Sequence, residues 1–164
     1  MPMSEREQFI QNWEREFQTT LKVLKSYPSQ KGDFQPHDKC PNAKELAWKM
    51  AHEETFFVNG AITGNFEFAG FPPTPSTLQD IISSYESHHR DNAAKIKKMS
   101  DADFNKMVKI MVAPKTIGDV RSGDTLWMMM MDTVHHRGQF SVYLRMADGK
   151  VPSIYGPSGD EPWM

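Results

Sequence analysis

The chain has 164 residues, a formal net charge of −2 at pH 7 and a sequence pI near 6.3. Its Lys and Arg residues are interspersed with Asp and Glu, which excludes the basic surface that nucleic-acid binding requires. A chain of this length is predicted to form a single domain, residues 1–164, around one apolar core.

Three features predict a cytoplasmic protein that does not associate with membranes. Cys40 is the only cysteine, so an intrachain disulfide cannot form. The N-terminal stretch MPMSEREQFI lacks the basic start and apolar core of a secretory signal. The longest apolar run, residues 126–131, is far shorter than the roughly 20 residues of a membrane-spanning helix.

Four segments carry apolar residues at helical spacing, and stretches rich in proline and glycine separate them. The predicted helices cover residues 4–27, 42–62, 76–99 and 124–147. Two readings stay open for residues 107–112, which fit either a short helix or an extended piece. The tail, residues 151–164, holds three prolines and two glycines and is predicted to be irregular and to pack across the helices.

These segments predict an all-α fold, an up-and-down four-helix bundle with an irregular C-terminal tail. Bundles build their functional sites in the core, from side chains on facing helices. Candidate residues are therefore sought on the inner faces of the four segments.

The stretch LWMMMMDTVHHRGQFSVYLR, residues 126–145, combines a methionine run with ionisable side chains. Residues four apart on a helix share nearly the same face, so Asp132 and His136 become neighbours. A carboxylate oxygen and an imidazole nitrogen at this spacing can bind one divalent ion. The alternative is an Asp–His pair without metal, which stabilises a helix by roughly 0.2–0.5 kcal/mol.

Two ligands are too few for a tight metal site, so a third is expected from another helix. His52 is the candidate, because it lies with Trp48 on the inner face predicted for residues 42–62. His135 and Tyr143 are candidates for acid–base groups or for partners that orient a ligand.

The other histidines and methionines of the helical segments fit structural roles. His88 and His89 flank the apolar stripe of residues 76–99 and are expected at its half-exposed boundary. Methionine fills irregular gaps in a core, and a helix that is apolar on most sides requires burial on most sides. Part of the run 128–131 is therefore expected to face a partner chain, which favours a homodimer.

Three segments resemble the DinB/YfiT-like family of four-helix proteins: HHRGQFSVYLR at 135–145, VPSIYGPSGDEPW at 151–163, and ELAWKMAHEE at 45–54 after PHDKCP. The resemblance covers nearly the whole chain. It implies an up-and-down bundle, often dimeric, in which three histidines from the second and fourth helices hold a divalent metal, commonly nickel or zinc. Some members resemble low-molecular-weight thiol transferases or isomerases, in which the metal activates a thiolate.

This chain departs from the ligand pattern of that family at two positions. His136 matches the last ligand, whereas Asp132 stands four residues earlier in place of a histidine. Lys49 occupies the position where family members often carry the histidine of the second helix, and His52 lies one turn later. Two imidazoles and one carboxylate would suit nickel or zinc, and also iron or manganese, with coordination positions left open.

Two functions follow from these residues. The first is a metal-dependent enzyme acting on a small molecule, either a hydrolase or a thiol S-transferase with a thiol cofactor, with His52, Asp132 and His136 as metal ligands. The second is a non-catalytic binding or stress-associated protein in which Lys49 pairs with Asp132 and no metal binds. The direction of the Lys49 side chain separates them: toward the cluster it favours the second function, and toward solvent the first.

Overall fold

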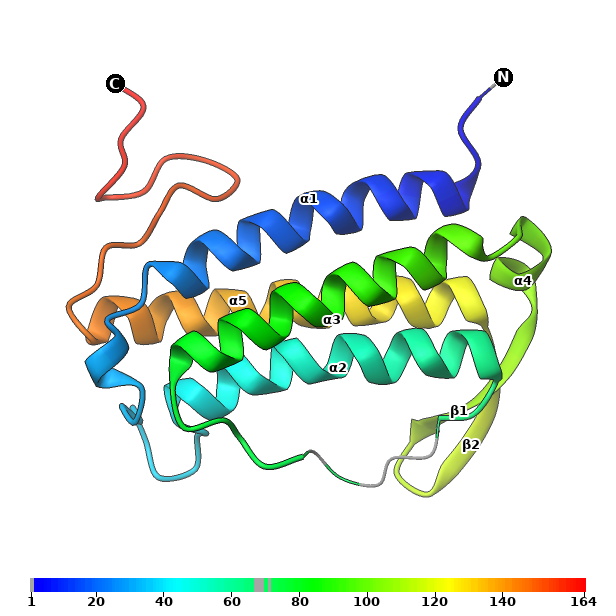
Figure 1. Ribbon diagram of the computed structural model, residues 1–164, viewed down its shortest axis with the longest axis horizontal. Helices are drawn as coiled ribbons and strands as arrows, with labels where there is room; N and C mark the ends of the chain where they lie inside the picture. The colour runs from blue at the N-terminus through cyan, green and yellow to red at the C-terminus, as the bar shows by residue number, and fades with distance from the viewer. Residues whose placement is uncertain (1, 67–69, 71) are drawn as a thin grey trace.

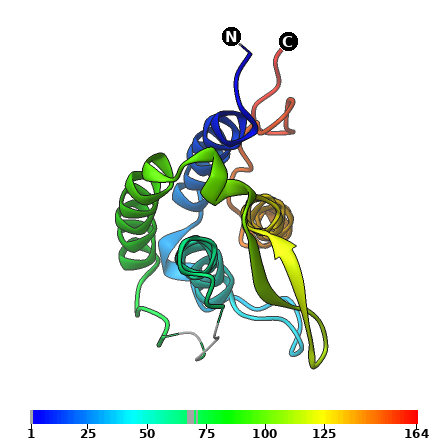
Figure 2. The same cartoon turned by 90° about the vertical axis from the view of Figure 1, so that its right-hand side faces the viewer.

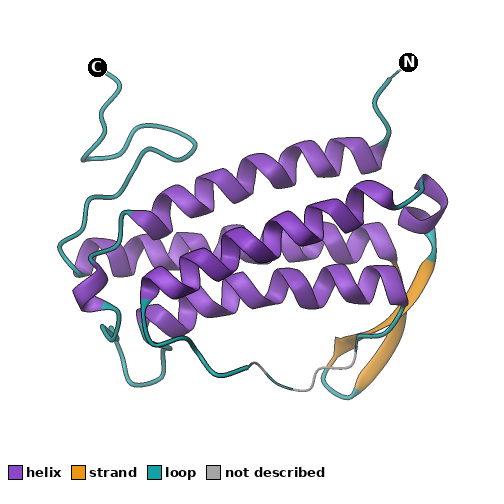
Figure 3. Cartoon of the chain, viewed as in Figure 1, coloured by secondary structure: helices purple, strands orange, loops and turns teal. Residues whose placement is uncertain are grey.

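The computed structural model describes residues 2–66, 70 and 72–164, and four long helices dominate it (Figures 1 and 3). The elements in chain order are α1 (Glu5–Lys25), the 3-10 turn η1 (Ser29–Lys31), α2 (Ala43–Thr63), α3 (Leu78–Lys98), α4 (Asp101–Asn105), β1 (Met107–Ala113), β2 (Thr116–Arg121) and α5 (Ser122–Met146). The four long helices lie within two residues of the predicted segments at each end. No helix of the described residues has the length and apolarity needed to cross a membrane.

Local capping chemistry sets where the first two long helices begin. Ser4 accepts a hydrogen bond from the backbone of Glu7, and the Glu7 side chain accepts one from the backbone of Ser4. Asn42 and Glu45 form the same reciprocal capping box at the start of α2. At the other end of α2, Gly64 adopts the left-handed φ of 79° that a glycine accepts without strain.

The order of helix directions differs from a simple up-and-down bundle. α1 and α5 run in one direction, whereas α2 and α3 both run in the other (Figure 1). The end of α2 and the start of α3, separated by residues 64–77, therefore lie at opposite ends of the bundle (Figure 1). These 14 residues can reach roughly 46 Å when extended, which exceeds the roughly 32 Å length of a 21-residue helix. Seen end-on, the four helices form a ring in which α2 lies between α3 and α5 (Figure 2).

A β-hairpin joins α4 to α5, so the all-α prediction holds only in part. β1 and β2 pair antiparallel with Met107 opposite Arg121, and Lys115 takes a φ of 61° in the turn. On β1, Val108 and Ile110 are buried while their neighbours are exposed, which is the alternation of a strand that covers a core. The extended reading of residues 107–112 is therefore confirmed.

Polar side chains at mid-length divide the core of the bundle into two apolar clusters. The cluster nearer η1 contains Phe17, Leu24, Leu46, Met50, Ile81, Tyr85, Phe140 and Leu144. The cluster nearer the hairpin contains Phe9, Trp13, Val58, Ile96, Phe104, Leu126 and Met129. The polar layer between them is formed on every long helix by residues that lie between the two clusters in the sequence: Glu14, Glu16, Glu53, Glu54, His89, Asn92, Asp132, His136 and Arg137.

His89 lies inside this polar layer, so its prediction as a half-exposed boundary residue is wrong. Its exposed fraction is 3% and that of Glu54 is 2%. Nδ1 of His89 lies 3.1 Å from the Glu54 carboxylate, and Nε2 lies 3.2 Å from Glu14. Trp13 and Asn92 each donate a further hydrogen bond to Glu54. The histidine is buried because acidic groups on α1 and α2 satisfy both of its nitrogens.

On the opposite side of the layer, buried Arg137 ties α5 to α1 and to the tail. Its exposed fraction is 2%, and Nη1 donates to Glu16 at 2.7 Å and to Thr20 at 3.1 Å. The Tyr155 hydroxyl donates to the same Glu16 carboxylate at 2.7 Å, and its ring lies beneath the guanidinium. The predicted packing of the tail across the helices is confirmed at this contact.

We expect Arg137→Met to lower the free energy of unfolding by about 3–5 kcal/mol, because it leaves the Glu16 carboxylate without its buried cation. The matched control is Arg145→Met, which removes a half-exposed pair between α5 and Asp160 of the tail and should cost about 1 kcal/mol or less. Urea unfolding followed by circular dichroism measures both. Equal stability of the two variants would contradict a structural role for the buried pair.

Candidate metal centre

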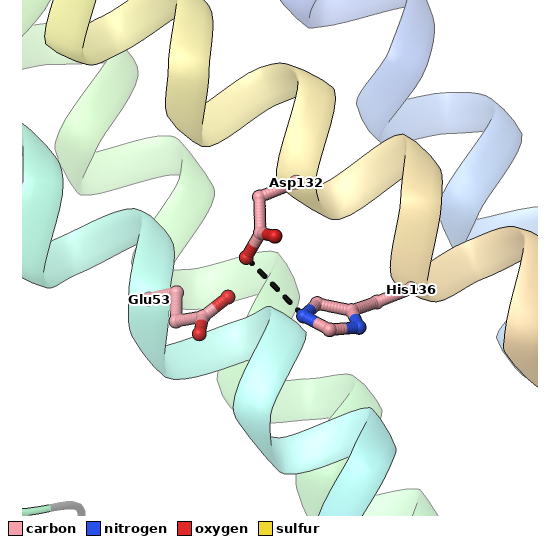
Figure 4. A group of neighbouring side chains, drawn as sticks. All are labelled: Glu53, Asp132 and His136. Atoms are coloured by element: carbon pink, nitrogen blue, oxygen red, sulfur yellow. Dashed lines mark ion pairs between the residues drawn. The ribbon is translucent and has the colours of Figure 1, made fainter. Parts of the chain in front are cut away.

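The candidate site lies where α2 and α5 face each other across the polar layer. Lys49 and Glu53 stand four residues apart on α2, and Asp132 and His136 stand four apart on α5. Each pair therefore shares one helical face, and packing of the two helices brings the four side chains together. Figure 4 shows Glu53 pointing from α2 toward Asp132 and His136 on α5.

Three side chains of this cluster have the geometry of a metal-ligand set. A ligand atom from each of Glu53, Asp132 and His136 lies within 4.8 Å of the other two. His136 Nε2 lies 3.2 Å from Asp132 Oδ2. One imidazole and two carboxylates are ligands that zinc and other divalent first-row metals accept.

A chain of hydrogen bonds orients His136 so that its Nε2 faces the cluster. Nδ1 of His136 lies 3.0 Å from Gln139 Oε1, and Gln139 Nε2 lies 3.0 Å from His135 Nε2. The amide nitrogen donates to His135, so the amide oxygen accepts the Nδ1 proton of His136. This assignment leaves the Nε2 lone pair directed at Asp132 and Glu53, as in histidines whose second nitrogen is held by a neighbouring group.

Glu53 carries the least satisfied polar atom of the cluster. Its side chain is 13% exposed, and no hydrogen-bond partner reaches the buried Oε2 among the described residues. The pKa of Glu53 is raised from 4.5 to about 8, chiefly by burial and further by the nearby Asp132, while Lys49 acts in the opposite direction. In its ionised form this carboxylate is costly to bury, and a cation bound between Glu53, Asp132 and His136 would remove that cost. The residues present therefore fit a divalent metal.

Lys49 points into the cluster. Its Nζ lies 2.7 Å from His136 Nε2 and 3.3 Å from Glu53 Oε1. An ammonium at this position donates to the imidazole and offsets part of the negative charge of Glu53 and Asp132. A Lys49 side chain directed toward the cluster is what the non-catalytic function predicts. The position of Lys49 therefore favours a polar network that needs no metal.

The structure brings two of the three predicted ligands together and places the third elsewhere. Asp132 and His136 belong to the cluster, whereas His52 does not. The His52 ring lies 5.8 Å from that of Trp48, on the side of α2 that faces α3, and its pKa is lowered by burial and by His88. Helix geometry explains why Glu53 and not His52 joins Lys49. With about 100° per residue, Glu53 lies about 40° from Lys49 around the helix axis, whereas His52 lies about 60° from it in the opposite sense. Because Glu53 stands four residues after Lys49 and so shares its helical face, this spacing could have identified Glu53 as a candidate ligand.

The two candidate acid–base residues lie outside the ligand set. His135 is exposed, and it contacts the cluster only through Gln139 and the 5.2 Å approach of its ring to that of His136. Tyr143 is buried nearer η1, where its hydroxyl donates to the backbone of Pro41 at 3.0 Å. Burial and the neighbouring Cys40 raise the pKa of Tyr143 to about 12.

Comparison with known proteins places the chain among helical proteins of one family. A sequence profile of the DinB family matches residues 1–163. The uncharacterized protein YrdA of Bacillus subtilis (strain 168) is 29% identical over 160 residues, covering 93% of this chain and 89% of YrdA.

Two solved structures share the fold. One is a DinB-like protein from Bacillus cereus ATCC 10987, with a TM-score of 0.77 and 19% identity over 94% of this chain and 100% of that chain. The other is the DinB-like protein YjoA from Bacillus subtilis, with a TM-score of 0.72 and 16% identity over 87% of this chain and 94% of that chain.

The fold and the cluster together define a helical bundle with a candidate metal site between two facing helices. The chain belongs to the DinB family, because the family profile spans nearly its whole length. The resemblance seen in residues 45–54, 135–145 and 151–163 is thereby confirmed.

The raised pKa of Glu53 predicts a pH dependence of folding in the metal-free protein. The folded carboxyl keeps its proton up to about pH 8, whereas the unfolded chain releases it near 4.5. The stability from this group is therefore fully present below pH 4.5 and is lost as the pH rises through about 8. Glu53→Gln stays neutral and should reduce the loss between pH 5 and pH 8, measured by urea unfolding with a chelator present.

The matched control is Glu45→Gln, an exposed glutamate of the same helix that keeps its capping geometry. It should lose stability with pH as the parent does. An identical pH profile for the Glu53 and Glu45 variants would show that the Glu53 carboxyl is not held protonated.

Proposed function

We propose that this chain is a metal-dependent enzyme whose divalent ion is held between α2 and α5 by Glu53, Asp132 and His136. One observation carries the proposal: the three ligand atoms converge within 4.8 Å. A second supports it, since one of the contributing side chains, Glu53, has a buried oxygen without a partner among the described residues. A divalent ion would coordinate this oxygen and balance the charge of its carboxylate. Membership in the DinB family supports the same site.

The ligand set supports zinc or nickel, and iron or manganese as further candidates, because two carboxylates and one imidazole suit all four. A bound metal would lower the pKa of a coordinated water or thiol, the chemistry of hydrolysis or of S-transfer with a thiol cofactor. The Gln139 amide would keep the His136 ring in place, and Asp132, with a side chain 39% exposed, would lie at the side of the site open to a small-molecule substrate. We further propose a cytoplasmic location, in keeping with the single Cys40.

A second candidate function follows from Lys49. Its ammonium already lies 2.7 Å from His136 Nε2 and 3.3 Å from Glu53. In this alternative, the cluster is a permanent Lys–Glu–Asp–His network, and the chain acts as a non-catalytic binding or stress-associated protein.

Metal content separates the two functions. The protein is purified without a polyhistidine tag, exposed to zinc, nickel or manganese, dialysed and measured by elemental mass spectrometry. We expect about one equivalent in the parent and a loss of at least tenfold in affinity for Glu53→Gln, Asp132→Asn and His136→Gln, because each removes a ligand.

Two histidine variants serve as controls for this experiment. His52→Gln and His135→Gln should keep the metal, because both residues lie outside the ligand set. Loss of metal in His52→Gln would mean that His52 is a metal ligand, and it would contradict the assignment of Glu53 as the ligand from α2. Absence of bound metal in the parent with all three ions would favour the non-catalytic function.

We also propose that a second copy of the chain covers the outer face of α5. Four apolar side chains of this face are 46–64% exposed: Met128, Met131, Val142 and Met146. In their midst Gly138 has open space where a Cβ would stand, which permits a partner helix to approach closely. A helix face of this kind is typical of a surface that another chain buries.

Val142→Glu should shift the protein from dimer to monomer, because it places a charge in the centre of the proposed interface. Size-exclusion chromatography with light scattering measures the mass. Val112→Glu, at a comparably exposed position on β1, should remain dimeric. A monomeric parent would exclude the proposed interface.

A further inference from the structure

Lys49 occupies atoms that a metal ion would need. Its Nζ contacts His136 Nε2 at 2.7 Å and Glu53 Oε1 at 3.3 Å. When Nδ1 of His136 donates to Gln139, Nε2 has one lone pair. That lone pair can accept a hydrogen bond from Lys49 or bind a metal, and it cannot do both. Lys49 and a metal ion are therefore mutually exclusive partners of His136.

We propose that Lys49 is an exchangeable internal cation, which holds the cluster together in the metal-free protein and leaves it when a divalent ion binds. This inference rests on the proposed metal function. The ammonium compensates the net negative charge that the Glu53–Asp132 pair brings into the cluster as the chain folds, before any metal arrives. A metal ion must then displace it, so Lys49 weakens the affinity of the site for metal.

The identity of the cation follows from the ion pairs around the cluster. Lys49 is the basic residue paired with Glu53, whereas His136, with its Nε2 3.2 Å from Asp132, is neutral in this assignment and supplies no charge. In the described part of the chain, no arginine or second lysine forms an ion pair with either carboxylate. Departure of Lys49 without replacement would leave the negative charge of the cluster, which includes the largely buried Glu53, uncompensated. Its release is therefore linked to the arrival of another cation.

The exposure of the side chains gives Lys49 a route out of the cluster. The Lys49 side chain is 34% exposed, compared with 13% for Glu53 and 10% for His136. Its flexible four-carbon stem can carry the ammonium into water while the stem stays against α2. The exchange therefore requires side-chain rotation and no movement of the helices.

Zinc affinity of the chelator-stripped full chain tests this proposal, measured by calorimetry or by competition with a chromophoric chelator. Lys49→Met keeps the apolar stem and removes the charge, so it should bind zinc at least about tenfold more tightly than the parent. Lys49→Arg keeps a permanent positive charge and should show no gain. Lys44→Met is the matched control, because Lys44 lies on the same helix and pairs with Asp33 outside the cluster.

Two further readouts separate this role from a general change in packing. Without metal, Lys49→Met should unfold at a lower temperature than the parent, because Glu53 and Asp132 lose their cation. In the parent, limited acetylation followed by mass spectrometry should modify Lys49 several-fold faster with zinc than without it. If Lys49→Met does not fold, Lys49→Leu replaces it, because it also removes the charge and leaves the His136 Nε2 lone pair free.

The outcomes distinguish the inference from the proposed function. Tighter zinc binding by Lys49→Met supports the inference, and it does so even if the parent binds no zinc, nickel or manganese, in which case the proposed function fails. Zinc binding by the parent with equal or weaker binding by Lys49→Met overturns the inference and leaves the function standing. If neither protein binds any of the three ions, both are overturned.

Discussion

The polar layer at mid-length of the bundle constrains how the four helices can be rotated about their axes. Burial of a charge without its partner costs several kcal/mol, so each ionised side chain in the layer must face a particular neighbour. His89 on α3 faces Glu54 on α2 and Glu14 on α1, and Arg137 on α5 faces Glu16 on α1. A rotation of any one helix would break at least one of these pairs. The geometry of the cluster between α2 and α5 therefore depends on the charge pairing elsewhere in the layer.

The α2–α5 cluster differs from the rest of the layer in how well its charges are satisfied. Glu54 and Arg137 each form hydrogen bonds with several side chains of the bundle. Glu53 does not: one of its carboxylate oxygens is the buried side-chain atom without a partner in the described part of the chain. Such an atom is often found where a ligand, an ion or a proton transfer belongs. Lys49 reduces the imbalance of charge and leaves that oxygen unsatisfied.

The carboxylates of Asp132 and Glu53 set the electrostatic character of the candidate site. Neutral histidines hold a metal without adding charge, whereas two carboxylates create a negative site that attracts a cation even when no metal is present. A lysine one turn before Glu53 is the nearest source of that charge. The acidic side chains and Lys49 are therefore chemically linked: the carboxylates make an inward-pointing lysine favourable, and the lysine makes the carboxylates tolerable in a partly buried position.

Short-range patterns in the sequence were sufficient for much of the fold. The four long helices and the capping boxes at Ser4 and Asn42 depend on neighbours within one turn, and so does the approach of Asp132 to His136. The β-hairpin was only one of two readings, because Val108 and Ile110 alternate over too few residues to exclude a helix. The shared direction of α2 and α3 was missed, since the length of the connection 64–77 permits a return along the bundle without requiring it.

For the candidate site too, some relations follow from the sequence alone and others only from the tertiary structure. The sequence by itself determined that Asp132 and His136 share a face of one helix, because that relation is a property of the helix alone. Only the tertiary structure decided which residues of α2 meet them. Lys49, His52 and Glu53 stand within about 100° of one another on α2, and the choice among them depends on how the whole bundle rotates that helix. Long-range charge pairing across the polar layer sets that rotation, and no local sequence pattern encodes it.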